Sequence, residues 1–195
     1  MHGLINRAIE RFVRDTYGRD TWGQVVRRAD LSFNEFEAML TYEAEVTTQV
    51  LDAIAQVLGR PEAEVLEDIG TYLVSHPKVE ALRRLLRFGG RTFTEFLHSL
   101  DDLPARARLA VSDLDLPVLE LCEHGGGFFS LTCQWSRAGF GHVIVGLLRA
   151  LADDYGALII LDHKGGGGGC EAIEIRVLNT EHATGRSFDL GARAE

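Results

Sequence analysis

The hydrophobic period of this sequence changes near residue 104, and this change is the feature that most constrains the fold. Before it, apolar residues recur every three or four positions, the spacing that places them on one face of a helix. After it, short alternating runs of apolar and polar residues flank clusters of glycine, which is typical of β-hairpins. The sequence predicts helices over residues 2–17, 20–29, 32–40, 43–59, 60–76, 77–90 and 139–156, and hairpins over residues 117–136 and 157–179.

This order of elements indicates an α+β fold. The two hairpins give an antiparallel sheet, and the helix at 139–156 lies between them in the chain and covers one face of that sheet. The 195 residues include four scattered prolines and no Ser/Pro-rich linker. We therefore predict a single domain over residues 1–195, with a mainly helical part at 1–103 and an α/β part with two hairpins at 104–195.

One proline interrupts an otherwise helical segment, "FLHSLDDLPARARL" at residues 96–109. The apolar residues of this segment share one helix face. Pro104 lacks the backbone N–H that a helix interior uses, which costs about 3 kcal/mol if the residue sits in the middle of a helix. The pattern leaves two alternatives open: Pro104 kinks one continuous helix, or it begins a second helix.

Charge and cysteine content exclude several classes of protein. The net charge of −9 and the pI of about 5.3 argue against a nucleic-acid footprint, which needs clustered Lys and Arg. The one basic run, at residues 80–91, is predicted to be a solvated helix face. Three widely spaced cysteines without a C-x-x-C pair favour a reducing compartment, and no apolar run is long enough to cross a bilayer. We expect a cytoplasmic protein that binds neither nucleic acid nor membrane.

No motif in the sequence predicts catalysis. The stretch "KGGGGGC" at residues 164–170 is followed by a strand pattern, so it is interpreted as a loose turn rather than a phosphate loop. The histidines and cysteines never fall at the spacing of zinc ligands, and there is no G-x-S-x-G nucleophile elbow. We therefore predict that the chain is not an enzyme.

Several segments, in their order along the chain, resemble heme–nitric oxide/oxygen-binding domains (H-NOX, also called HNOB). These are sensor domains related to the regulatory part of soluble guanylate cyclase. The resemblance covers nearly the whole chain and implies an H-NOX-like fold, with heme between the helical half and the sheet half. It also implies a role in nitric oxide, gas or redox sensing. The segments that carry it are "MHGLINRAIERFVRDTYGRDTW", "GTYLV", "FLHSLDDL", "LDLPVLEL" and "GFGHVIVGLLRALADDYG".

The resemblance also assigns positions to heme-binding residues. In the family, a histidine after the "F-L-x-x-L-D-x-L" helix supplies the only protein bond to iron, and a Y-x-S-x-R motif binds the propionates. The histidine position is Pro104 here, and Pro117 matches the family's own proline at the same separation. The second motif falls on "CQWSR", where Cys133 stands for the tyrosine, Trp135 stands for the serine and Arg137 matches. The resemblance thus implies a divergent member that lacks the proximal histidine, with Arg137 as the propionate candidate.

Three outcomes remain open for the expected heme cavity. Heme binds through a substitute iron ligand, for which His98 is the candidate, or through cavity contacts and Arg137. Alternatively, the cavity takes another apolar molecule, such as a tetrapyrrole precursor, a bilin or a lipid. In the third outcome, bulky side chains including Trp135 fill the space.

The leading prediction is a heme- or tetrapyrrole-binding sensor domain. The alternative is a heme-free module that binds a protein or another small apolar ligand. The resemblance further implies a signalling partner such as a histidine kinase or a cyclic-dinucleotide enzyme.

Overall fold

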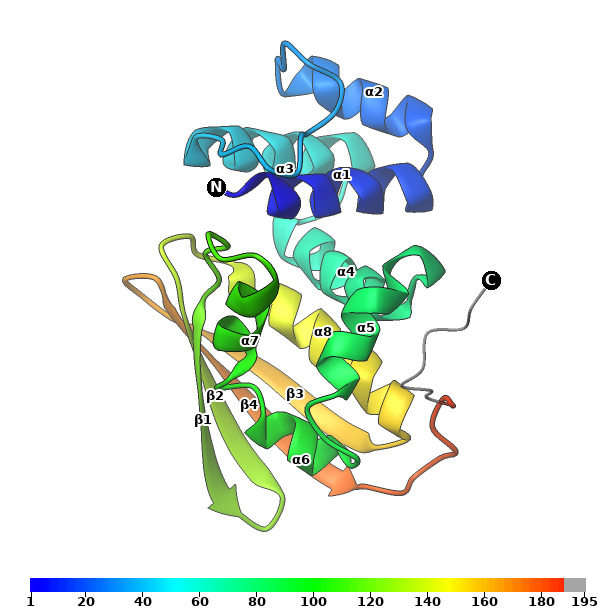
Figure 1. Ribbon diagram of the computed structural model, residues 1–195, viewed down its shortest axis with the longest axis vertical. Helices are drawn as coiled ribbons and strands as arrows, with labels where there is room; N and C mark the ends of the chain where they lie inside the picture. The colour runs from blue at the N-terminus through cyan, green and yellow to red at the C-terminus, as the bar shows by residue number, and fades with distance from the viewer. Residues whose placement is uncertain (188–195) are drawn as a thin grey trace.

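The molecule consists of two lobes, an N-terminal lobe of three helices and a C-terminal lobe built on a β-sheet (Figure 1). This computed structural model describes residues 1–187, apart from the side chain of Ala110, so residues 188–195 of the predicted domain lie outside the described residues. The N-terminal lobe contains α1 (Gly3–Thr16), α2 (Arg19–Arg28) and α3 (Ala44–Leu58).

The C-terminal lobe carries the remaining elements. Among the residues that the structure describes, no helix combines the length and the apolar character that a membrane span needs. The elements are α4 (Glu62–Ser75), the 3-10 helix η1 (Pro77–Val79), α5 (Glu80–Arg87), α6 (Phe93–His98), α7 (Leu103–Ala110), β1 (Val118–Gly125), β2 (Phe128–Gln134), α8 (Phe140–Tyr155), β3 (Leu158–Gly165) and β4 (Cys170–Asn179).

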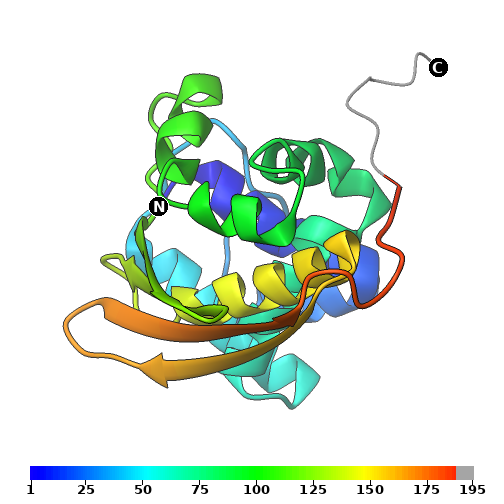
Figure 2. The same cartoon turned by 90° about the horizontal axis from the view of Figure 1, so that it is seen from below.

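The four strands form one antiparallel sheet in the order β1-β2-β4-β3. The two hairpins join through β2 and β4, where Leu131 lies opposite Ile173 in the middle of the pairing. Helix α8 lies across one face of the sheet (Figure 2). The α+β fold with an antiparallel sheet and a covering helix, predicted from the order of elements, is confirmed.

Two hydrophobic clusters form the core of the molecule, one on each side of the space between the lobes. The first packs α8 against the sheet and α6, and its fully buried members include Phe96, Leu100, Leu131, Leu148 and Ile173. The second packs α1 to α4 together and includes Phe12, Val25, Phe36, Val50 and Ile54. Phe140, in the first turn of α8, packs against both clusters. The space between the lobes is therefore bordered by apolar side chains from both sides.

Helices α4 and α8 cross with their backbones in contact. A Cβ atom added to Gly146 would lie 1.9 Å from the carbonyl oxygen of Glu67, and one added to Gly70 would lie 2.0 Å from the carbonyl oxygen of Val143. Both distances are far below any tolerable contact, so only glycine fits at these two positions. Ile69 on α4 and Val143 on α8 both border the inter-lobe space.

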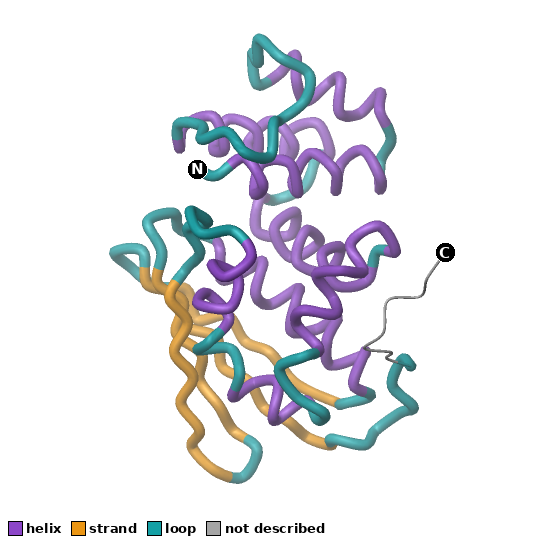
Figure 3. The backbone as a smooth tube through the Cα atoms, in the orientation of Figure 1, coloured by secondary structure: helices purple, strands orange, loops and turns teal. Residues whose placement is uncertain are grey.

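The segment at residues 32–40 is a loop between α2 and α3, so the helix predicted there is wrong (Figure 3). Its backbone groups bond to side chains of neighbouring helices instead of to each other. The Phe36 N–H donates to the carboxylate of Glu10 at 2.7 Å, and Trp22 Nε1 donates to the carbonyl of Asn34 at 2.7 Å. These long-range bonds, together with full burial of the Phe36 ring, outweigh the local helical pattern.

The segment at residues 96–109 is not one helix, which settles the question of Pro104. Helix α6 ends at His98, and α7 begins at Leu103 with Pro104 as its second residue. The first turn of a helix does not use its backbone N–H groups, and proline already has the backbone angle that a helix requires. Pro104 therefore lies in the first turn of a new helix, where it does not incur the energetic penalty of a proline in a helix interior.

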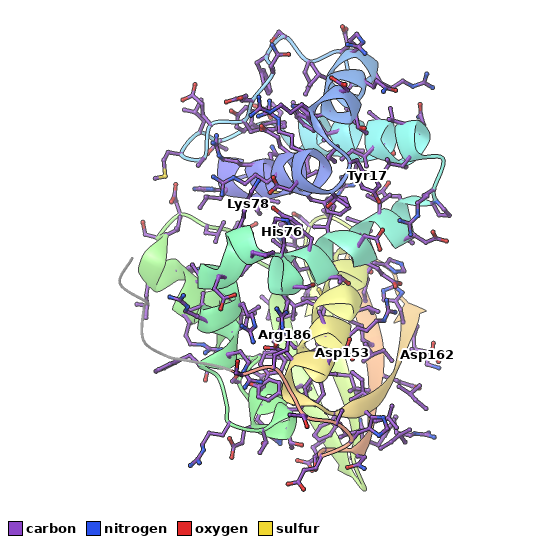
Figure 4. All side chains as sticks on the ribbon, turned by 90° about the vertical axis from the view of Figure 1, so that its right-hand side faces the viewer. Tyr17, His76, Lys78, Asp153, Asp162 and Arg186 are labelled. Atoms are coloured by element: carbon purple, nitrogen blue, oxygen red, sulfur yellow. The ribbon has the colours of Figure 1, made fainter. Side chains whose placement is uncertain are left out.

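The predicted solvated face of the basic run at residues 80–91 is wrong at Arg83. This side chain is 6% exposed and holds the carboxylate of Asp154, with Nη2 donating at 2.7 Å and Nε at 3.0 Å. Neighbouring Arg87 places its guanidinium 3.7 Å above the ring of Tyr155. From the far end of the chain, the Arg186 N–H donates to the carbonyl of Asp154, beside the last turn of α8 (Figure 4). The basic run thus packs α5 onto α8.

Candidate functional site

An apolar cavity of about 330 Å³ lies between the two lobes. Its size falls in the range of small-molecule sites. Side chains of α1 and α3 line it from the N-terminal lobe, and side chains of α4, α5, α7, α8 and the chain around Pro117 line it from the C-terminal lobe. The lining side chains are Met1, Leu4, Ile5, Ala8, Ile9, Thr47, Leu51, Leu66, Ile69, Leu73, Leu82, Leu85, Leu86, Leu103, Pro104, Ala107, Val111, Leu114, Leu116, Pro117, Leu119, Trp135, Arg137, Phe140, Val143, Ile144 and Leu147.

Helix α7 presents one face to the cavity. Leu103, Pro104 and Ala107 all line it, and Ala107 follows the other two at spacings of four and three residues, which puts them on the same side of the helix. The first turn of α7 is placed by the helix start at Leu103, which proline favours. The residue at position 104 therefore lies in the cavity wall. The resemblance to H-NOX domains implies an iron ligand at this position.

The few polar groups of the cavity wall are already bonded. Arg137 donates to the hydroxyl of Thr48 on α3 and, at 2.8 Å, to the carboxylate of Glu62 on α4. Trp135 Nε1 donates to the carboxylate of Asp115 at 3.1 Å.

Thr47 completes the set, because its hydroxyl donates to Oδ1 of Asn6 at 2.8 Å. The side-chain charges of Arg137 and Glu62 thus cancel, and the hydroxyl of Thr47 and the ring N–H of Trp135 each already donate a hydrogen bond.

Two other candidate residues lie outside the cavity wall. Cys133 on β2 is buried in the core between sheet and α8, and burial raises the pKa of its thiol to about 12, so it stays protonated near neutral pH. His98 ends α6 with its side chain 49% exposed, 3.2 Å from the carboxylate of Glu123 and edge-on to the ring of Phe129. The structure therefore does not bring His98 to the cavity, and its position gives the substitute-ligand prediction no support.

Sequence reasoning missed the partners of the wall residues. Glu62 and Thr48 lie 75 and 89 residues from Arg137 in the chain, and Asp115 lies 20 residues from Trp135. No local pattern marks such pairs, because the partners are distant in sequence and meet only in the folded chain.

The fold and the cavity together define a two-lobed α+β domain with a small-molecule-sized cavity at the lobe interface. Residues 2–162 match the family model described as haem-NO-binding (HNOB), and the chain belongs to this family. The fold agrees: an H-NOX protein from S. oneidensis, solved in its Fe(II) ligation state, is similar with a TM-score of 0.79 and 19% identity. That similarity covers 93% of this chain and 98% of the solved one.

Relatives at the sequence level include much longer proteins. Soluble guanylate cyclase gcy-31 of Caenorhabditis elegans is 28% identical over 155 residues, which are 79% of this chain and 22% of the relative. Soluble guanylate cyclase 89Da of Drosophila melanogaster is 21% identical over 160 residues, which are 82% of this chain and 24% of the relative. The chain therefore spans less than a quarter of the length of these curated relatives.

The described residues of the cavity wall do not fit an iron-bonded heme. Proteins hold heme iron with histidine, a cysteine thiolate, tyrosine, or methionine paired with histidine. No histidine, cysteine or tyrosine is among the lining residues, and Pro104 has no donor atom; Met1 alone contributes a thioether. Nowhere in residues 1–187 do three or more His, Cys, Asp or Glu side chains gather so that they could hold a metal ion. The apolar faces of a tetrapyrrole are chemically compatible with the apolar wall, but the wall offers no histidine to bind the iron.

Proposed function

We propose that this chain is a non-catalytic sensor domain whose inter-lobe cavity binds a small apolar molecule. The observation that carries the proposal is the cavity itself, because both lobes contribute its apolar wall. A molecule in contact with α1 on one side and α7 and α8 on the other favours one packing of the lobes over another. Binding then shifts the population between two lobe arrangements, which is how a sensor domain reports occupancy. The proposed signalling partner that responds to this change is a separate histidine kinase or cyclic-dinucleotide enzyme.

Two ligand classes follow from the family and from the cavity wall. Membership of the HNOB family makes heme or a related tetrapyrrole the first class to test, for gas or redox sensing. The second class is an iron-free apolar molecule, and the lack of a histidine, cysteine or tyrosine in the wall favours it. Pro104 in the wall supports the proposal that this chain lacks the bond to iron that other family members make.

Hemin and iron-free protoporphyrin IX differ only in the metal, so comparing them shows whether a bond to iron contributes to binding. Where the full chain binds either molecule, we expect the two dissociation constants to lie within about threefold of each other, measured by absorption and by quenching of tryptophan fluorescence, since no bond to iron adds affinity. His98→Ala should leave both constants unchanged, as should the matched surface variant His124→Ala.

A preference for hemin above about 30-fold, roughly 2 kcal/mol, would contradict the iron-free interpretation. If that preference disappeared in His98→Ala, His98 would be the iron ligand after all. If neither molecule bound, the iron-free class would be the one that remains.

A further inference from the structure

We propose that the inter-lobe cavity selects an uncharged, predominantly hydrocarbon molecule and discriminates against the corresponding acid. This inference rests on the proposed function, namely that the cavity binds a ligand, and it adds the chemical class of that ligand. It is carried by the size of the cavity, by the charge balance of its wall and by the bonds that its polar groups already make.

The volume of the cavity sets the size of the molecule. A dry cavity of about 150 Å³ lined by aliphatic and aromatic side chains binds benzene. The inter-lobe cavity, at about 330 Å³, is roughly twice as large and has the same kind of lining. It therefore suits a molecule of about ten carbon atoms.

The charge balance of the wall determines which head group the cavity accepts. Arg137 is the single charged side chain among the described lining residues, and Glu62 neutralises it with a direct bond at 2.8 Å. A carboxylate that entered the cavity would have to displace Glu62 or lie beside its negative charge. The first arrangement leaves the carboxylate of Glu62 without its partner, and the second takes a charge out of water beside a like charge, so both are unfavourable.

The polar side chains of Thr47 and Trp135 offer no replacement partner for an acid. Thr47 donates its hydroxyl hydrogen to Asn6, and Trp135 donates its ring N–H to Asp115. An anion would have to break one of these bonds to gain another. An alcohol or a hydrocarbon keeps all of them and still gains the apolar contacts.

Glu62 is the residue that imposes this selectivity, and it can be tested by itself. In Glu62→Gln the bonded geometry is conserved but the guanidinium of Arg137 is no longer neutralised, so a carboxylate gains a partner. Glu64→Gln is the matched control, because Glu64 lies on the same helix and pairs with Arg60 at an exposed site outside the cavity.

The test uses displacement of the uncharged fluorophore N-phenyl-1-naphthylamine from the full chain at pH 8. The competitors are 1-decanol and decanoate, which have equal chain length and differ in charge. We expect 1-decanol to displace the fluorophore at a concentration at least about tenfold lower than decanoate. Glu62→Gln should strengthen the binding of decanoate about tenfold and change that of 1-decanol by less than twofold. Glu64→Gln should change the binding of neither competitor.

Two sets of results overturn different statements. If decanoate competes as well as 1-decanol, or if Glu62→Gln leaves decanoate unchanged, the inferred selectivity is wrong and the cavity is still a ligand site. If the fluorophore does not bind saturably, or if its binding survives both Ala8→Phe and Ala107→Phe, the proposed function itself fails. These two variants fill the cavity from opposite lobes, and circular dichroism confirms that each one folds.

Discussion

Replacing Pro104 by histidine is expected to give the full chain an iron ligand and to raise its preference for hemin over protoporphyrin IX to about 100-fold, roughly 3 kcal/mol. Residue 104 is in the first turn of α7 and in the cavity wall, so an imidazole there points into the space between the lobes. The first turn of a helix tolerates histidine as it tolerates proline, because backbone N–H groups are not bonded there. One imidazole is sufficient to hold heme iron in many heme proteins.

The absorption spectrum of reconstituted Pro104→His measures this gain directly. The expected result is a sharp Soret band that the unaltered chain lacks under the same conditions. Leu109→His is the matched control, because Leu109 lies on the same helix, is 89% exposed and does not line the cavity. Equal spectra for Pro104→His and Leu109→His would show that an imidazole at position 104 does not bind heme iron.

Asp154→Ala is expected to destabilise the protein by about 3 kcal/mol. Asp154 is 1% exposed and is bonded to Arg83, with Arg87 and Arg186 each 3.8 Å away. The bonded carboxylate raises the pKa of the Arg83 guanidinium, which therefore stays charged. Without Asp154, a buried cation keeps only Glu80 as its bonded carboxylate, beside two further positive charges.

Thermal unfolding measures this loss, and for a chain of this size it corresponds to a decrease of roughly 10 °C in Tm. The control is Asp153→Ala on the exposed side of the same helix (Figure 4), for which we expect a change below about 0.5 kcal/mol. The double variant Arg83→Met with Asp154→Leu should recover most of the stability, because it removes the buried charges together. Equal Tm values for Asp154→Ala and Asp153→Ala would contradict this account of how α5 packs on α8.

Those parts of the fold that depend on local pattern could be predicted from the sequence. The hairpins and the helix between them follow from alternation, glycine turns and a 3.6-residue period, all of which act within a few residues. The loop at residues 32–40 could not be predicted, because Glu10 and Trp22, distant in sequence, bond its backbone. The burial of Arg83 likewise depends on Asp154, 71 residues further along the chain.

The candidate site divides in the same way. The resemblance to H-NOX domains named Pro104, Trp135 and Arg137, and the structure brings all three to one cavity. It also named Cys133, which lies in the core behind the wall, while His98, the candidate substitute ligand, lies at the surface. The bond that neutralises Arg137 joins it to Glu62, 75 residues away in the chain, so only the folded chain reveals it.

Hydrogen exchange of the full chain with and without saturating 1-decanol tests the central claim, that an apolar ligand binds between the lobes and alters their packing. The account predicts slower exchange in α1, α4, α7 and the first half of α8, which line the cavity from both lobes, with no change in α2. Slower exchange confined to the sheet face that α8 leaves uncovered, or no change in any helix, would contradict it.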